Sequence, residues 1–223
     1  QTGYLYESWS KDGGETWSEP TQSRFMSTNS PANLLRLRDG RILLAWDNCT
    51  FGNLPDIRGD RAIVSAAISD DEGATWRGYR EIARSTRSYA IAYPWMVELP
   101  DNRVLTHLWF GSYTLPPFGP DWLLETSILD DFSQGLDQWS VLGSEGVALV
   151  DHPDNPGRKI MSLRKTNAEN AATAVRNFPF GVRGRLDLKL RLQTDFQGTR
   201  VCLSDYYWLP PIERKGRFGI LIE

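Results

Sequence analysis

Three aspartates that follow an apolar segment have types and spacing suited to hydrolytic chemistry. Asp47 ends the run ILLAWD, and Asp56 and Asp60 lie in the segment that comes next. Cleavage of a glycosidic bond uses two carboxyl groups that flank the bond, so Asp47 with Asp56 or Asp60 is a candidate pair. Aspartates in long loops are more often simply solvated, and the spacing leaves both interpretations open.

A histidine and two tryptophans in the segment WMVELPDNRVLTHLWF form a second group of candidates. His107 could act as a general base, or bind a divalent metal beside Asp47, although a lone histidine is more often a hydrogen-bonded strand residue. Trp95 and Trp109 could stack on a sugar ring or could fill the interior of a β fold. A divalent metal is therefore a possible cofactor, but the chemistry requires none.

The composition argues for a globular protein and against several partners. Among 223 residues, 40% are hydrophobic and nine are Trp, while the net charge is -3 with no basic run, so we expect no nucleic-acid and no membrane partner. No stretch approaches the roughly 20 apolar residues of a membrane-spanning helix. The chain begins at Gln1 without a signal segment, which indicates a processed chain or a piece of a longer one. Cys49 and Cys202 show no metal-ligand spacing and are interpreted as independent thiols.

A repeated octapeptide indicates which elements hold these residues. SKDGGETW at residues 10–17 and SDDEGATW at residues 69–76 share Ser, Asp, Gly, Thr and Trp at the same places, 59 residues apart. Ser and Asp side chains in such a pattern bond nearby backbone N–H groups, Gly supplies a conformation that other residues resist, and Trp packs under the turn. Asp12 and Asp71 are therefore predicted to hold hairpins shut rather than to catalyse a reaction.

Two hairpins accompany the repeat. LLRLRDGRILLAWDN turns at Asp39 and Gly40, MVELPDNRVLTHLWF turns at Asp101 and Asn102, and each continues into an apolar strand. With RAIVSAAIS, the octapeptide and REIA, the unit contains four antiparallel strands in about 60 residues, which is typical of one propeller blade. We predict an all-β chain with a partial β-propeller of about two blades.

Strand parity separates the two rims of such a blade. The hairpin turns and the octapeptides share one rim, so segments 27–31, 47–61, 88–94 and 111–121 are expected at the opposite mouth. Function in a propeller usually lies on the loops of one mouth, and we look for the site there.

The sequence changes character near residue 115. TLPPFGPDW is rich in Pro and Gly and is interpreted as a linker, while RLDLKLRLQ alternates Leu with charged residues, as in a half-exposed antiparallel strand of a β-sandwich. We predict incomplete propeller blades over residues 1–127 and an incomplete β-sandwich over residues 128–223.

The octapeptides and hairpins resemble the Asp boxes and blades of the sialidase-like, six-bladed propeller glycoside hydrolases, also called BNR-repeat proteins. The resemblance covers residues 1–127, and the remainder resembles, by pattern alone, the concanavalin-like (laminin G type) sandwiches often fused to such propellers. A six-bladed propeller needs six repeats, and this chain contains parts of about two and a half.

The resemblance implies roles for particular residues. AYPWMVELPDNRVLTHLWF is similar to the late sialidase hairpin that follows the catalytic tyrosine, which places Tyr93 at the nucleophile's position. NSPANLLRLRDGRILL is similar to the hairpin that follows the assisting glutamate, but Ser30 stands at that place. Asp47 stands where the family carries an arginine that binds the substrate carboxylate, and Arg61 remains as a basic candidate at the same mouth. The candidate substrate-binding residues are Asn29, Ser30, Asn48, Trp95 and His107.

These differences favour a substrate other than ordinary sialic acid. A tyrosine phenol needs a neighbouring carboxylate to act as a nucleophile at neutral pH, which Ser30 cannot supply, and Asp47 repels a carboxylate. Three functions stay open: a glycosidase with Tyr93, Asp47 and Arg61 as catalytic residues, a carbohydrate-binding or scaffold fragment without turnover, and metal-assisted ester hydrolysis by Asp47 and His107 at a site formed on oligomerisation.

Unpaired blade faces also favour a homo-oligomer, with a trimer first and a dimer second. The family resemblance implies a secreted or periplasmic location.

Overall fold

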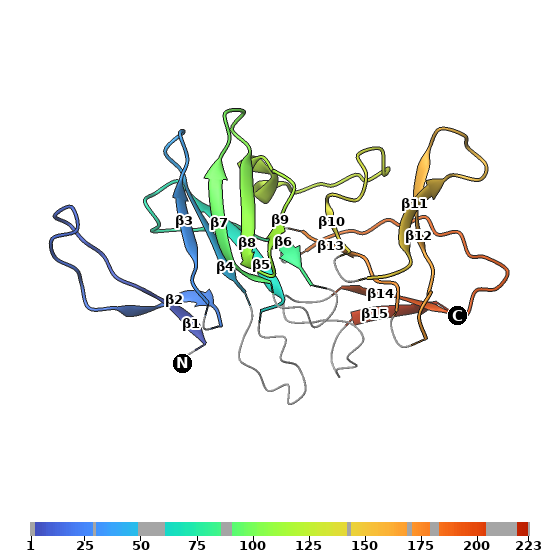
Figure 1. Ribbon diagram of the computed structural model, residues 1–223, viewed down its shortest axis with the longest axis horizontal. Coiled ribbons are helices and arrows are strands. Elements are labelled where there is room, and N and C mark those ends of the chain that lie inside the picture. Colours follow the sequence, from blue (N-terminus) through green and yellow to red (C-terminus); the bar gives the residue numbers. More distant parts are fainter. Residues whose placement is uncertain are drawn as a thin grey trace.

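The computed structural model describes residues 3–28, 30–48, 61–85, 91–141, 144–168, 171–178, 183–203 and 218–222, and these residues form an all-β fold (Figure 1). Every strand pair in the described ranges is antiparallel. Their one helix is a short 3-10 turn, η1 (Pro120–Leu124). Within these ranges no helix has the length and apolar character needed to cross a membrane. The predicted all-β class is confirmed.

A four-stranded sheet forms the centre of the N-terminal region. Its strands pair in the order β3-β4-β5-β6, which is the order of the predicted blade. Every residue of β5 is buried, and so is most of β4, because both faces of this sheet are covered. The strands are β3 (Asn33–Arg36), β4 (Ile42–Asp47), β5 (Ile63–Ser69) and β6 (Arg77–Arg84).

Two smaller sheets cover the central sheet, one on each face. On one face, the ring of Phe25 lies 4.9 Å from the ring of Trp46. On the other face, Leu43 and Ile68 pack with Val104 in one buried cluster. This stacking of sheets is consistent with a partial propeller. The covering strands are β1 (Tyr4–Glu7) and β2 (Thr21–Met26) on the first face, and β7 (Ala92–Glu98), β8 (Val104–Phe110) and β9 (Tyr113–Thr114) on the second.

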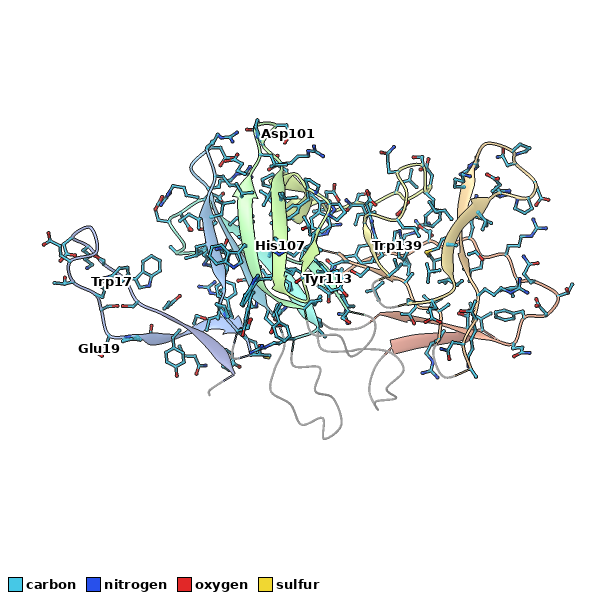
Figure 2. All side chains as sticks on the ribbon, in the orientation of Figure 1. Trp17, Glu19, Asp101, His107, Tyr113 and Trp139 are labelled. Atoms are coloured by element: carbon cyan, nitrogen blue, oxygen red, sulfur yellow. The ribbon has the colours of Figure 1, made fainter. Side chains whose placement is uncertain are left out.

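The two predicted hairpin turns have the same geometry. In the first, the backbone N–H of Arg41 donates to Asp39 Oδ1 at 3.0 Å and its Nε donates to Asp39 Oδ2 at 2.8 Å. Arg103 makes the same two bonds to Asp101 at 3.1 and 2.8 Å. Each turn also requires a left-handed residue, which explains Gly40 in the first turn. Figure 2 shows Asp101 at the tip of the β7–β8 hairpin.

The octapeptides close hairpins in the predicted way. The Asp71 carboxylate accepts bonds from the Thr75 backbone N–H at 2.8 Å and from the Thr75 hydroxyl at 2.6 Å. Asp12 accepts the equivalent bonds from Thr16, and these bonds lower the pKa of Asp12 to about 2. The boxes are therefore structural, with one difference from expectation: Trp17 is largely exposed, because its hairpin extends away from the sheets (Figure 2).

An ion pair places the first hairpin turn and the second Asp box at the same rim, as predicted. Arg36, at the first hairpin turn, contacts Glu72 of the second box at 2.6 Å. Arg41 contacts Asp121 at 2.7 Å, which also places Asp121 at this rim. The prediction that the whole of segment 111–121 lies at the opposite mouth is therefore wrong for its last residues, because the chain reverses at Gly111 and runs back along β8.

The segment interpreted as a linker is packed against the first sheets. The backbone N–H and C=O of Val104 both bond Phe118, at 2.8 and 3.1 Å, which extends the ladder along the edge of β8. Phe118 and Leu123 then enter the cluster between the central sheet and β8. Pro and Gly prevent a regular strand here, but they do not prevent burial, so the linker interpretation is wrong. The predicted boundary after residue 127 follows η1 directly and stays a prediction.

The C-terminal region contains small two-stranded ladders. The predicted strand over residues 185–193 is wrong: these residues form no ladder in the described structure, and the leucines from Leu186 to Leu192 are all exposed. Alternation of apolar and charged residues is typical of a strand with one buried face, but a strand also needs a neighbouring strand to bond its backbone N–H and C=O groups. The ladders pair β10 (Trp139–Ser140) with β13 (Val175–Arg176), β11 (Val147–Asp151) with β12 (Lys159–Leu163), and β14 (Thr199–Leu203) with β15 (Phe218–Ile222).

Candidate functional site

The mouth opposite the Asp boxes is assembled by backbone bonds that continue past the ends of the strands. The N–H of Asn48 donates to the C=O of Ile63 at 2.8 Å, at the end of the β4–β5 ladder. The N–H of Ile91 donates to the C=O of Arg61 at 2.5 Å, which joins the segment before β5 to the segment before β7. The described parts of two predicted mouth segments, 47–61 and 88–94, therefore lie at one end of neighbouring sheets.

Arg61 and Tyr93 meet at this mouth. The guanidinium carbon of Arg61 lies 5.0 Å from the centre of the Tyr93 ring and 5.1 Å from that of Phe110, within the range of cation–π attraction. The ring of Tyr93 also stacks on Trp109, with centroids 5.9 Å apart and planes inclined by 17°. Cation and aromatic faces thus form one surface at the ends of β7 and β8, which we call the Arg61 cluster: Arg61, Tyr93, Trp109 and Phe110.

Tyr93 has an unusual backbone. Its φ is +59°, in the left-handed region that residues with a Cβ enter at an energetic cost, and it occupies this conformation inside a strand. Its neighbours hold it there: Ala92 pairs with Phe110 and Pro94 pairs with Leu108. Residues in such conformations are concentrated at functional sites, where surrounding structure over-determines them.

Asp47 and Ser30 lie deeper at the same mouth. Asp47 is fully buried at the end of β4, and the Thr28 hydroxyl donates to its Oδ2 at 2.5 Å. Ser30 is also buried, and its hydroxyl finds no hydrogen-bond partner among the described residues. Asn48 is buried as well, and its side chain donates to Ser65 Oγ at 3.1 Å. These three residues are therefore part of the buried interior beneath the mouth rather than of its exposed surface.

Trp95 and His107 lie on a different face. They are cross-strand partners on β7 and β8, and Trp95 is 66% exposed. His107 Nδ1 lies 2.9 Å from the hydroxyl of Thr114 on β9, next to Tyr113 (Figure 2). Since side chains alternate along a strand and the intervening residue Leu108 is buried toward the central sheet, His107 faces away from β4.

The structure therefore divides the predicted site into two groups. Tyr93 and Arg61 are in contact, and Asp47, Asn48 and Ser30 are held nearby at the mouth. His107 is on the outer face of β8, and its described bond goes to Thr114, whereas that of Asp47 goes to Thr28. In the described ranges no three His, Cys, Asp or Glu residues gather as metal ligands. The predicted residues Asn29, Asp56 and Asp60 lie outside the described residues.

Two contacts of the site were not predicted from the sequence. Phe110 was missed, although it ends β8 directly before the mouth segment at Gly111. Thr28 was missed too, although it lies in segment 27–31. Both residues lie within or next to segments assigned to the mouth, but their positions along the sequence do not predict which side chain contacts Arg61 or Asp47.

The repeats have a counterpart among known protein families. Residues 1–106 match the family model of the BNR repeat-like domain. The match covers a little under half of the chain and includes both Asp boxes, the central sheet and most of the β7–β8 hairpin. It supports a BNR-repeat, sialidase-like family for the N-terminal region. No curated protein matches the chain significantly.

Proposed function

We propose that this chain binds carbohydrate at the Arg61 cluster, as a sialidase-like BNR-repeat protein. The observation that carries the proposal is the placement of the Arg61 guanidinium over Tyr93 and Phe110, with Trp109 stacked on Tyr93 and 65% exposed. The C–H face of a pyranose ring is apolar and packs on an aromatic face, while a guanidinium supplies several donors to sugar hydroxyls. The cluster offers both kinds of contact on one surface.

The expected ligand is a neutral or modified sugar. Asp47, where the family carries a carboxylate-binding arginine, is a buried acid bonded to Thr28. An acid at this place disfavours the carboxylate of ordinary sialic acid by like-charge repulsion. Arg61 provides a positive charge at the mouth, and its guanidinium lies over the aromatic rings of Tyr93 and Phe110.

Hydrolysis with Tyr93 as nucleophile is the second candidate function. The left-handed φ of Tyr93 favours it, because strain of this kind is typical of catalytic positions. Its described ring contacts are Arg61, Trp109 and Phe110, and none of these can accept the phenol proton. Turnover therefore requires a carboxylate at the mouth, for which Asp47 is the described candidate. Metal-assisted ester hydrolysis is not favoured by the geometry, because His107 lies on the outer face of β8, whereas Asp47 is buried at the end of β4.

Binding is tested with a panel of neutral, acetylated and acidic glycans, measured by calorimetry on the parent chain and two variants. Trp109→Ala should weaken binding at least tenfold, because a central aromatic anchor commonly contributes more than about 1.4 kcal/mol. Trp17→Ala is the matched control, since Trp17 is 63% exposed at the opposite rim. Failure of the parent to bind any glycan, or equal losses in both variants, would remove the proposal.

Hydrolysis is tested on the same preparations with chromogenic glycosides and esters, with and without a chelator. Release of chromophore from a glycoside that persists with chelator supports the second candidate. Binding without release leaves the first as the function.

A further inference from the structure

A buried arginine joins the central sheet to the C-terminal region. The Arg80 side chain of β6 is completely buried, and its guanidinium lies 3.6 Å from the ring centre of Trp122. Its Nη1 donates to the C=O of Trp122 and to Glu125 Oε2, the latter at 3.1 Å, and its Nη2 donates to the C=O of Asn177 at 3.2 Å.

A second arginine approaches the same place. Arg176 precedes Asn177, is largely buried, and has Asp130 3.7 Å from its Nη1, which is within range of charge attraction but beyond a hydrogen bond. Glu125 attracts both arginines, whereas the two arginines repel each other. Burial is the main cause that lowers the pKa of both, to about 10 for Arg80.

The cluster has more buried donors than acceptors. Four buried N–H groups have no hydrogen-bond partner among the described residues: Arg80 Nε, Trp122 Nε1, Arg176 Nε and Arg176 Nη1. The nearest carboxylates accept hydrogen bonds from other N–H groups: Glu125 accepts from Arg80 Nη1, and Asp130 accepts from the Trp139 indole at 2.7 Å. Buried donors in folded proteins are nearly always satisfied, so these N–H groups call for an acceptor other than the described residues.

We propose that the cluster of Arg80, Trp122, Glu125 and Arg176 binds a small oxyanion. Planar guanidinium groups match the paired oxygens of a carboxylate, sulfate or phosphate. An anion that replaces the Glu125 carboxylate continues to offset the repulsion between the two arginines, which a water molecule does not do. Glu125 is 43% exposed and forms the solvent side of the cluster, so the anion enters by displacing its carboxylate. A bound anion would tie residues 176–177 to β6 and η1.

The test follows the thermal unfolding midpoint of the full chain as sulfate is added at constant ionic strength, with sodium chloride as the balancing salt. A parallel titration uses acetate, and saturation by either anion supports the site. The midpoint should rise by about 3 to 6 °C at ten times the dissociation constant, as expected for a ligand that binds only the folded state of a chain of this size.

Three variants connect the shift to the cluster. Arg176→Gln should abolish the shift. Glu125→Gln should lower the half-saturating anion concentration several-fold, because it removes the competing carboxylate. Arg185→Gln removes an equal charge from an exposed ion pair with Asp187 and should leave the shift unchanged.

Two results would overturn the proposal. One is a parent midpoint that does not respond to either anion. The other is an equal response in Arg176→Gln, which would indicate a general salt effect. If Arg176→Gln does not fold, Glu125→Gln decides, and an unchanged half-saturating concentration rejects the site.

Discussion

The guanidinium of Arg61 lies 5.0 Å from the ring centre of Tyr93, although Arg61 precedes a strand of one sheet and Tyr93 lies within a strand of another. Arg61 comes two residues before the start of β5 in the central sheet, and Tyr93 is the second residue of β7. The backbone bond from Ile91 to the Arg61 carbonyl brings them together. The mouth surface is therefore a product of stacking between two sheets.

If the chain cleaves glycosides, Tyr93→Phe should reduce kcat by at least about 10²-fold, because it removes the only oxygen of the proposed nucleophile. The ring contacts with Arg61 and Trp109 are retained, so folding and glycan binding should change little. Steady-state turnover with the best chromogenic substrate measures the effect. A well-folded variant with unchanged kcat would show that Tyr93 takes no part in the chemistry.

The Asp71→Ala variant should lower the thermal unfolding midpoint without affecting glycan binding. Asp71 accepts bonds from the backbone N–H and hydroxyl of Thr75 and from Ser69, which close the β5–β6 turn. Asp71→Asn keeps one acceptor oxygen, so its unfolding midpoint should lie between those of Asp71→Ala and the parent. Identical midpoints for all three proteins would contradict the assigned role of the box.

Acid should weaken the first Asp box in a defined window. The pKa of Asp12 is lowered from 3.8 to about 2 by its bonds to Thr16, so its contribution to stability is complete above pH 3.8 and is lost as the pH falls toward 2. The difference in unfolding midpoint between the parent and Asp12→Asn should therefore shrink from pH 4 to pH 2. A difference that stays constant over this range would argue against the proposed linkage.

The buried ion pair between Glu81 and Arg84 should be sensitive to loss of one partner. Both side chains are almost completely buried at the end of β6, and Arg84 Nε donates to Glu81 Oε2 at 2.8 Å. Glu81→Gln leaves a buried guanidinium without its carboxylate and should cost about 3 kcal/mol in urea unfolding. Glu72→Gln breaks an exposed pair with Arg36 and should change little, so equal effects of the two variants would refute the argument.

Self-association through β7 and β8 is expected from the exposed side chains on their outer face. Trp95 and Val97 are exposed there, while the opposite face of the same strands packs on the central sheet as one blade does on the next. We propose a second copy as the occupant, with a trimer favoured and a dimer next. Light scattering should give a mass above 25.3 kDa, and Trp95→Ser should lower it. A parent that stays monomeric at high concentration would exclude the assembly.

Local features of the first region could be predicted from the sequence because their bonds close within a few residues. The Asp39 and Asp101 turns and both Asp boxes are stabilised by side chain to backbone bonds over two to four positions. Four strands in one meander follow from these turns and from the apolar runs between them. The blade order β3-β4-β5-β6 was accordingly predicted correctly.

Contacts between sheets could not be predicted in the same way. The contact of Arg61 with Phe110 and the burial of Phe118 depend on how one sheet stacks on another, and the spacing of residues along the chain does not encode that distance. The alternating leucines from Leu186 to Leu192 illustrate the converse, since their pattern suits a strand but the described structure offers them no ladder.

The all-β class, the turns and the repeat could be predicted from the sequence alone, because turn hydrogen bonds and strand periodicity depend on residues that are close together in the chain. The folded structure was needed to show that Tyr93 contacts Arg61, that His107 faces away from Asp47, and that Arg80 is buried against Trp122. Each of these relationships joins side chains from separate elements, so its geometry arises from packing and from the balance of burial and charge across the whole fold.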